Sequence, residues 1–290
     1  MIRKSNNIYE IEGKDLKEIL KPRALDSNKG MYGTVGILGG SPSYSGAIKL
    51  ANMSATSLRA GCGVVRVIVS SKIASYIAPY LLEQTLYILD NINNLELSLT
   101  NLDALAVGMG WGISDENKKY LETIIQTFKN PIIIDADGLN NLSMMDLNIL
   151  NKRRGKIILT PHLKEFSRLT NLSIQKIKEN KLTLAKKFAQ KYNVILLLKD
   201  SETIITDGTT TYITNSGCPG MATSGSGDVL SGLIVGMLGY LDATTQNIAF
   251  ASYLAGLAGT LAQRNNTDIS MIASDTIASI PQAIKFIREI

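Results

Sequence analysis

Short apolar runs rich in β-branched residues alternate with longer helical patterns along most of this chain of 290 residues. The runs that predict strands lie at residues 34–38, 64–69, 104–107, 132–134, 157–159 and 194–198. The patterns that predict helices between them include residues 47–59, 117–128 and 173–191. Such alternation is typical of βαβ units, so the sequence predicts an α/β fold with a mostly parallel central sheet flanked by helices.

The segment around Asp207 and Gly208 has a different pattern. Two short β-rich runs flank this Asp-Gly pair in ETIITDGTTTYIT, which is a strong signal for a β-hairpin. The chain contains no low-complexity linker, composition break or convincing internal repeat. The sequence therefore predicts a single domain over residues 1–290.

The composition is that of a globular protein, because 45% of the residues are hydrophobic and 19% are charged. The N-terminal stretch MIRKSNNIYEIEGKD lacks the apolar run of a signal peptide. The longest apolar runs, at residues 229–241 and 248–262, are shorter than the ~20 residues that span a bilayer. Cys62 and Cys218 show no CxxC spacing, which favours reduced thiols. We therefore expect a soluble cytoplasmic protein without membrane contact.

Positive charge is concentrated in one segment of the chain. Residues 151–191 contain 12 Lys and Arg against two acids, whereas the whole chain has a formal net charge of +5. This segment is either a solvated helix face or a surface that steers an anionic ligand such as a nucleotide. No arginine-rich arm or aromatic-studded basic strand accompanies the charge, so we expect no nucleic-acid binding.

Unusual residues follow the predicted strands, where open α/β sheets bind their ligands. The stretches GGSPSYSGA, GMGWG, DADGLN, TPHLKEF and KDSET all occupy such positions. The chain has no GxxxxGK[ST] motif, and no GxGxxG motif follows a strand. A phosphate group would therefore have to be bound in another way.

The stretch CPGMATSGSGDVLSG offers such a way. The backbone N–H groups of Gly225, Ser226 and Gly227 can form an anion nest at the N-terminus of the apolar helix that follows. Gly227 also lacks the Cβ atom that would block a phosphoryl group. Asp228 then falls in the first helical turn, where it can stabilise the helix or act as a general base. The alternative is a flexible loop with an ordinary acidic first turn.

The stretch LTPHLKEF contains His162, the only histidine of the chain. Thr160 is suited to cap the following helix and Pro161 to occupy its first position. A single histidine is either structural or catalytic, and the place of His162 after a strand favours the catalytic role.

The stretches KGMYGTVGILGGSPSYSGA, GMG, DADGLN, LTPH and GCPGMATSGSGDVLSGL resemble, in order and spacing, the NAD(P)H-hydrate dehydratases. The resemblance extends from about residue 25 to about residue 261. It implies a ribokinase-like three-layer sandwich and a cytoplasmic, homotetrameric lyase of metabolite repair. Such an enzyme dehydrates the S-epimer of hydrated NADH or NADPH by phosphorylating its hydroxyl and eliminating phosphate. The implied co-substrate is ADP, or else ATP, together with Mg²⁺.

Residue by residue, the resemblance assigns the hydrated dinucleotide to Ala47, Gly110, His162 and Asp228, with Asp228 also as the catalytic base. It assigns the nucleotide to Lys199, Asp200, Ser201, Glu202, Thr203 and Gly227. No metal-ligand set is evident, and only Asp135 and Glu165 are candidates. The chain departs from the family pattern at Asp200, where the family has glycine, at Cys218 and Ser224, and at Leu163-Lys164.

Two other functions remain open on the sequence. One is a small-molecule kinase of the same fold, which phosphorylates a vitamin precursor or a sugar and shares the GSGD aspartate. The other is a nucleotide-binding protein without catalytic activity, an alternative that the acidic Asp200 leaves open.

Overall fold

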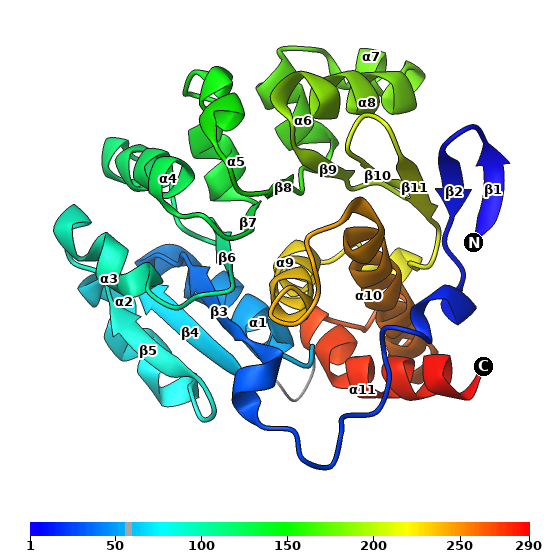
Figure 1. Cartoon of the computed structure of the whole chain (residues 1–290), viewed down its shortest axis with the longest axis horizontal. Coiled ribbons are helices and arrows are strands. Elements are labelled where there is room, and N and C mark those ends of the chain that lie inside the picture. The colour runs from blue at the N-terminus through cyan, green and yellow to red at the C-terminus, as the bar shows by residue number, and fades with distance from the viewer. Residues whose placement is uncertain (56–59) are drawn as a thin grey trace.

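The protein is described by a computed structural model that covers residues 1–55 and 60–290. In this part of the chain, eleven strands form one sheet in the order β1-β2-β11-β10-β9-β8-β7-β6-β3-β4-β5 (Figure 1). The strands are β1 (Ile2–Ser5), β2 (Ile8–Glu10), β3 (Thr34–Leu38), β4 (Val64–Val69), β5 (Thr85–Ile88), β6 (Ala104–Val107), β7 (Ile132–Ile134), β8 (Ile157–Leu159), β9 (Ile195–Leu198), β10 (Thr203–Thr206) and β11 (Thr211–Thr214). The helices are α1 (Ser45–Ala55), α2 (Ser71–Ile77), α3 (Leu95–Leu99), α4 (Asp115–Thr127), α5 (Asp137–Leu142), α6 (Leu163–Thr170), α7 (Ile174–Glu179), α8 (Lys181–Tyr192), α9 (Ser226–Met237), α10 (Thr245–Asn266) and α11 (Ala273–Glu289).

The central strands are parallel from β9 through β8, β7, β6, β3 and β4 to β5. Each is covered on both faces, so the sequence of each strand is a continuous apolar run rather than an alternating one. In β6, for example, Ala104 and Ala106 join the core on one face, whereas Leu105 and Val107 join the core on the other.

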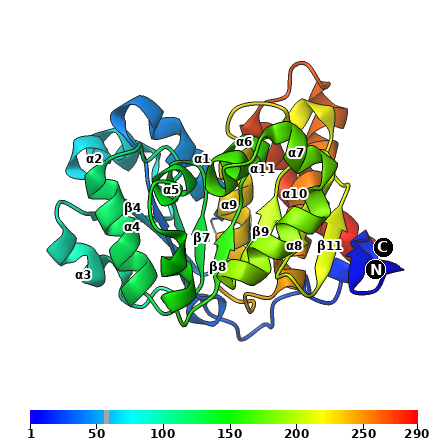
Figure 2. The same cartoon turned by 90° about the horizontal axis from the view of Figure 1, so that it is seen from above.

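Helices cover both faces of the sheet and complete three layers. Buried residues of α1, α2, α9, α10 and α11 pack with one face. Buried residues of α3 to α8 pack with the other face, and Figure 2 shows α4, α5 and α8 in front of the sheet, with α8 beside β9. The predicted fold class, a mostly parallel sheet between two helical layers, is confirmed.

The sheet has a switch in strand order beside β3. The chain runs from β3 outward to β4 and β5, and then returns to β6 on the other side of β3. Ligands of open α/β sheets bind outside the carboxyl ends of strands at such a point. The fold therefore brings the loops after β3, β6, β7, β8 and β9 to one edge of the sheet.

Most predicted elements lie where the sequence placed them, and the exceptions have local causes. Antiparallel pairing of Thr206 with Thr211 confirms the hairpin, whose turn holds Gly208 at φ +92°. The helix predicted at 173–191 is two helices, because Asn180 leaves the helical conformation at φ −129° and ψ 26°. The helix predicted at 47–59 begins earlier, at Ser45, and its last four predicted residues lie outside the described ranges.

The composition also led to expectations about membrane contact, the two cysteines and the basic segment. No helix in them is long and apolar enough to cross a membrane. Cys62 is buried and Cys218 half-buried, and both are free thiols. In the basic segment, the buried Arg153 donates to backbone carbonyl groups, among them those of Ile124 and Ile125. The charge of Arg153, one of the twelve in this segment, therefore has a structural role.

Candidate active site

The N-terminus of α9 forms one wall of the candidate site. Gly225 precedes the helix with φ +93°, and a Cβ there would lie 2.4 Å from the side chain of Leu50. Glycine is therefore required at this position. Gly227 lies inside the first turn without a positive φ, and a Cβ on it would lie 3.3 Å from Nζ of Lys199. The sequence predicts space for a phosphoryl group at Gly227, and in the structure this space lies beside the Lys199 ammonium group.

A buried polar network lies beneath this helix end. Lys199, directly after β9, donates to Oδ1 of Asp135 at 2.8 Å. Asp135 directly follows β7 and is 1% exposed, and its Oδ2 accepts from the Ser231 hydroxyl of α9 at 2.7 Å. Burial disfavours the charge of Lys199, but the Asp135 and Glu165 carboxylates outweigh it and raise the pKa of Lys199. The network therefore holds a charged ammonium group at the end of β9.

His162 is the N-cap of α6 and not a residue of its first turn. Its ring Nδ1 accepts from the backbone N–H groups of Lys164 and Glu165, both at 3.1 Å. Glu165 returns the contact, since its Oε2 accepts from the His162 N–H at 2.9 Å. The prediction that Thr160 caps this helix and Pro161 opens it is wrong. The Lys199 N–H bonds to the Pro161 carbonyl and holds that segment against the end of β9, so the helix begins later.

The cap fixes the chemistry of the His162 ring. Because Nδ1 accepts two hydrogen bonds, the proton of the neutral ring resides on Nε2. Burial, followed by the nearby Lys199 charge, lowers the pKa of His162 and favours this neutral form. The side chain is 49% exposed, and Nε2 lies 3.4 Å from Oε1 of Glu165. His162 can thus offer an N–H group to a ligand while it caps α6.

Two carboxyl groups of the site titrate near neutral pH. Burial, reinforced by the Asp135 charge and opposed by Lys199, raises the pKa of Asp228 to about 7. Burial also raises the pKa of Glu165 to about 7, against the attraction of Lys199. A carboxylate with such a pKa is suited to accept a proton at physiological pH.

The first turn of α1 and the loop after β6 bring Ala47 and Gly110 together. Gly110 has φ +61°, and a Cβ on it would lie 2.5 Å from the Tyr44 carbonyl oxygen and 3.0 Å from Cβ of Ala47. The Gly40 N–H donates to the Met109 carbonyl at 2.8 Å and joins the loops after β3 and β6. Both predicted residues therefore lie at the sheet edge that also carries Asp135.

A cavity of about 720 Å³ opens beside the α9 N-terminus, a size typical of ligand pockets. Its lining includes predicted site residues, namely His162, Lys199, Asp200, Ser201, Thr203, Ser226 and Gly227. The Ser226 hydroxyl is buried there and has no hydrogen-bond partner within the described part of the chain. The first-turn N–H groups of Gly227 and Asp228 have no intrahelical acceptor. These donors indicate an anionic group of a ligand at this end of the cavity.

Five of the predicted site residues lie outside the cavity lining, namely Ala47, Gly110, Glu202, Gly225 and Asp228. Gly225 and Asp228 belong to the same helix end but are not among the lining residues. Glu202 is exposed, and its carbonyl group accepts from Nζ of Lys181 at 2.8 Å. Among the residues that the structure describes, Glu202 does not contribute to the cavity lining.

The departures from the family pattern have structural counterparts. The Asp200 carboxylate accepts from Nζ of Lys181 at 3.1 Å and from the Ser201 N–H at 2.9 Å. Burial favours the neutral acid, but these two donors outweigh it and lower the pKa of Asp200. Cys218 lines the cavity, whereas Leu163 packs against the core. The acid at position 200 is therefore neutralised by a neighbour.

The candidate metal ligands are engaged in other contacts. In residues 1–55 and 60–290, no group of three or more His, Cys, Asp or Glu side chains could hold a metal ion. Both oxygens of Asp135 accept hydrogen bonds, and Oε2 of Glu165 caps the His162 N–H. Asp135 and Glu165 thus do not fit a protein cage for Mg²⁺.

Sequence reasoning missed Ser231 and Lys181. Ser231 lies three residues after Asp228 on one helix, a spacing that puts both on the same face, and this signal was available. Lys181 belongs to the basic segment, but its pairing with Asp200 joins residues 19 positions apart. Such a contact depends on the fold and has no local sequence signal.

The chain is similar in sequence to known proteins over most of its length. A family model described as NAD(P)H-hydrate dehydratase matches residues 35–282. The chain is 34% identical over 282 residues to the bifunctional NAD(P)H-hydrate repair enzyme of Moorella thermoacetica, which covers 93% of this chain and 52% of that protein. It thus spans about half the length of such curated relatives. It is 30% identical to the ADP-dependent (S)-NAD(P)H-hydrate dehydratase of Cenarchaeum symbiosum, over 93% of this chain and 95% of that protein.

Solved structures agree with these sequence matches. The ADP/ATP-dependent NAD(P)H-hydrate dehydratase of Bacillus subtilis, co-crystallised with ATP and Mg²⁺, superposes with a TM-score of 0.85 at 26% identity, over 98% of this chain and all of that one. A ribokinase-like superfamily protein of Enterococcus faecalis superposes with a TM-score of 0.86 at 25% identity, over the whole of both chains. The predicted ribokinase-like fold is confirmed.

Proposed function

Because the chain belongs to the NAD(P)H-hydrate dehydratase family, we propose that it dehydrates the S-epimer of hydrated NADH or NADPH at the expense of ADP or ATP. The observation that carries this proposal is the meeting of two features at one helix end. The cavity with its unpartnered Ser226 hydroxyl lies on one side of the α9 N-terminus, and Asp228 occupies the same turn. A phosphoryl donor and a proton acceptor can therefore act on one hydroxyl group.

The reaction needs the phosphoryl step because hydroxide is a poor leaving group. Asp228 accepts the proton of the substrate hydroxyl. At the same time the hydroxyl oxygen attacks the terminal phosphorus of the nucleotide, and the bond from that phosphorus to the rest of the nucleotide breaks. The electron pair of the ring nitrogen then expels phosphate from the neighbouring carbon. Loss of a proton from the adjacent ring carbon restores the dihydronicotinamide. The raised pKa of Asp228, about 7, suits a base that must gain and release a proton in each turnover.

Charge on the transferring group is balanced mainly by this chain's donors. The Gly227 N–H and the Ser226 hydroxyl line the cavity, and the Lys199 ammonium is held there by Asp135. Since residues 1–55 and 60–290 contain no group of three or more metal-ligating side chains, we expect Mg²⁺ to enter with the nucleotide phosphates, as this ion commonly does. Mg²⁺ would supply charge neutralisation on those phosphates.

The substrate side of the site consists of Ala47, Gly110 and His162 in this proposal. The first turn of α1 and the loop after β6 place Ala47 against Gly110, and the neutral His162 ring offers its Nε2–H to the hydrated ring or its carboxamide. Lys199 to Thr203 and Gly227 bind the nucleotide in this proposal. The Glu202 carbonyl acts indirectly, since it accepts from Nζ of Lys181.

We extend the proposal to the organisation of the protein. The single sheet joins strands from Ile2 to Thr214, which supports one domain over residues 1–290. The family resemblance supports a homotetramer, which light scattering on the purified chain can test. A repair enzyme must meet NADH and NADPH, which supports the cytoplasm as its location.

The test is an assay of the purified chain with hydrated NADH, Mg²⁺ and either ADP or ATP. We expect the absorbance of the dihydronicotinamide ring to return, with one phosphate released for each NADH formed. Net phosphorylation of an added vitamin precursor or sugar, without repair of the hydrate, would instead identify a small-molecule kinase. If the protein binds ADP or ATP but repairs the hydrate with neither of them, the proposal is contradicted.

A further inference from the structure

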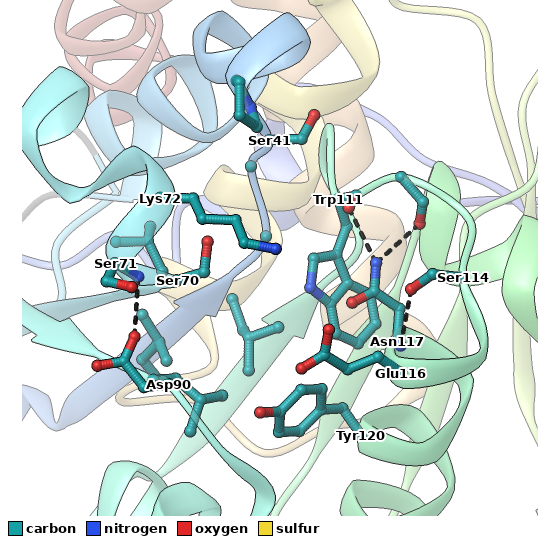
Figure 3. A pocket seen from close by; sticks show the side chains of 18 of the residues that line it. Ser41, Ser70, Ser71, Lys72, Asp90, Trp111, Ser114, Glu116, Asn117 and Tyr120 are labelled. Atoms are coloured by element: carbon teal, nitrogen blue, oxygen red, sulfur yellow. Dashed lines mark hydrogen bonds between the residues drawn. The ribbon is translucent and has the colours of Figure 1, made fainter.

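A cavity of about 670 Å³ lies at the amino edge of the sheet, where β3 and β4 begin. Its lining includes Tyr32, which precedes β3, and Gly61, which precedes β4. Most of the other lining residues belong to residues 19–23 and to α11, which lie side by side (Figure 1). The nucleotide cavity and a smaller one of about 390 Å³ lie at the opposite edge, the smaller one where β3, β4 and β5 end (Figure 3). We call the cavity of 670 Å³ the amino-edge cavity.

Helix α9 separates the amino-edge cavity from the active site. Ser226 in its first turn lines the nucleotide cavity, whereas Tyr240, just after its end, lines the amino-edge cavity. The 12 residues of α9 span ~18 Å at 1.5 Å per residue. Among the residues that the structure describes, the two cavities share none of their lining. A ligand of the amino-edge cavity can therefore bind together with the nucleotide.

Positive charge dominates the amino-edge cavity. Its ionisable side chains, apart from two tyrosines, are Lys21, Arg23, Lys285, Arg288 and Glu289. Each lysine has a carboxylate partner, at 2.8 Å for Lys21 and at 3.9 Å for Lys285. Neither arginine has such a partner within the described ranges of the chain. The lining therefore contains two guanidinium charges that no carboxylate neutralises.

Backbone contacts hold both guanidinium groups in place. Arg288 donates from Nε to the Leu20 carbonyl and from Nη2 to the next carbonyl, the latter at 2.9 Å. Arg23 donates from Nη2 to the Gly61 carbonyl, and its guanidinium carbon lies 3.8 Å from the centre of the Tyr32 ring. Since a guanidinium group has five N–H donors, both arginines keep donors for a ligand. These donors are positioned in advance, which lowers the entropy cost of binding an anion.

The Tyr240 hydroxyl group shows that the two charges act on the same region. Burial raises the pKa of Tyr240 to about 12, against the attraction of the Arg23 and Arg288 charges. The hydroxyl donates to the Ala60 carbonyl at 3.0 Å, so it is already engaged. One anionic group near Tyr240 can therefore interact with both arginines.

Apolar side chains form much of the remaining wall. The rings of Tyr32 and Tyr240 meet edge to face, with their centres 6.2 Å apart. The aliphatic lining residues are Ile19, Leu20, Pro281 and Ile284. An inorganic anion would leave this apolar surface in water, whereas a flat apolar ring would bury it. The volume of the cavity is typical of pockets for small organic ligands.

We propose that the amino-edge cavity binds a small aromatic acid, with its carboxylate at Arg23 and Arg288 and its ring against the wall of Tyr240 and Ile284. The unneutralised arginines select an anion, and the apolar wall selects an aromatic body. This site is separate from the proposed active site, and the inference does not depend on the proposed function.

The test is a calorimetric titration of the whole protein with 2-naphthoate in saturating ADP and Mg²⁺, which occupy the nucleotide cavity. The matched probe is 2-naphthamide, which has the same ring and no charge. We expect saturable binding of one 2-naphthoate per chain and an affinity for 2-naphthamide at least about tenfold weaker. A flat titration with 2-naphthoate, or equal affinities for the two probes, would overturn the proposal.

Substitution of Arg23 tests the charge. Arg23→Gln should weaken 2-naphthoate binding about tenfold and leave 2-naphthamide binding nearly unchanged, since it removes a charge-assisted contact. Arg264→Gln is the matched control, because Arg264 is an exposed arginine of α10 that does not line the cavity. Equal weakening of 2-naphthoate binding in the two variants would contradict a specific role for Arg23.

A third variant tests the location. Ile284→Trp adds volume inside the amino-edge cavity and keeps both arginines, so it should abolish 2-naphthoate binding and leave ADP affinity unchanged. Thermal unfolding checks that this variant folds. Undiminished 2-naphthoate binding in the folded variant would place the probe elsewhere and overturn the assignment. None of these measurements uses dehydratase turnover, so their failure would leave the proposed function untouched.

Discussion

A Cβ on Gly227 would lie 3.3 Å from Nζ of Lys199, although Gly227 has an ordinary helical backbone. We therefore predict that Gly227→Ala changes the stability of the free protein by no more than ~1 kcal/mol, because the helix preference for alanine offsets the small shift that the methyl group imposes on the Lys199 ammonium group. Nucleotide affinity should fall at least about tenfold, because the methyl group occupies space beside the ammonium group. Thermal unfolding without ligand and calorimetric titration of ADP measure the two effects.

Gly225→Ala is the matched control for this prediction. Its φ of +93° and the contact with Leu50 make any side chain costly, so this variant should lose stability by more than ~1 kcal/mol. A large loss of stability in Gly227→Ala with unchanged ADP affinity would show that its glycine is structural and that no phosphate approaches it.

Asp228→Asn should lower turnover at least ~10²-fold, the usual scale for loss of a general base. The change keeps the size of the side chain, and Asp228 is outside the cavity lining, so ADP affinity should stay within a few-fold of its original value. Steady-state assays and ADP titration on the same preparation test both parts. Turnover near the original rate would refute the role of Asp228 as base.

The pH dependence of kcat/KM should show an acid limb near pH 7. Burial raises the pKa of Asp228 to about 7, so the group becomes a competent base only as pH rises through that value. Activity should therefore increase with pH and then level off. Glu165 also has a pKa of about 7, so Glu165→Gln decides between them. The limb should persist in this variant and move to lower pH, because the Glu165 charge raises the pKa of Asp228. Its disappearance would make Glu165 the base.

His162→Ala should raise KM for the hydrated dinucleotide by a larger factor than it weakens ADP binding, although His162 also lines the nucleotide cavity. It should reduce stability by ~0.5–2 kcal/mol through loss of the α6 cap. His162→Asn separates the effects, since asparagine caps helices well but does not replace the ring. The His162→Asn variant should recover the stability of the unsubstituted protein but not its KM for the hydrated dinucleotide. A change in ADP affinity without a change in KM would contradict the assignment to the substrate.

The same residue makes stability depend on pH. Burial lowers the pKa of His162 below its ordinary value of 6.5, so the unfolded chain binds more protons in that range. The contribution of the neutral ring is therefore complete above pH 6.5 and is lost as pH falls towards the lower folded pKa. His162→Asn should remove this part of the pH dependence in denaturant titrations.

Lys181→Ala should weaken ADP binding several-fold, because it leaves the Asp200 carboxylate unneutralised at the cavity wall. Asp200→Gly removes that charge, so the double variant should bind ADP more tightly than Lys181→Ala alone. A double-mutant cycle by calorimetry measures this coupling. Purely additive effects would mean that the pair does not act on the nucleotide.

The sequence predicted the central strands well because buried parallel strands are continuous apolar runs. Six of the seven parallel strands were predicted, five with the observed bounds and one that begins a residue later, at Ile195. The seventh, β5, was missed, since it lies at the edge of the sheet and both its end residues are exposed. β1 and β2 were missed, since β1 is exposed along its whole length and has no apolar run. The break at Asn180 was also missed, because the helical periodicity continues through both helices.

Prediction of the site succeeded for single residues and failed for their partners. Asp228, Gly227 and His162 could be identified because each lies in a distinctive local motif. The cap by His162 was assigned to Thr160, because the bridge between His162 and Lys199 is a tertiary contact. The pairing of Asp135 with Ser231 spans 96 positions and has no local signal either.

Asp135, His162 and Lys199 follow three adjacent strands, β7, β8 and β9, of which the pairs β7–β8 and β8–β9 are hydrogen-bonded in parallel. Neighbouring strands lie ~4.8 Å apart, a spacing set by backbone geometry rather than by side chains. The hydrogen-bonded sheet therefore fixes the separation of the backbone at these three residues before any ligand binds. Little conformational entropy remains to be lost on binding, and the free energy of each contact goes into affinity and orientation.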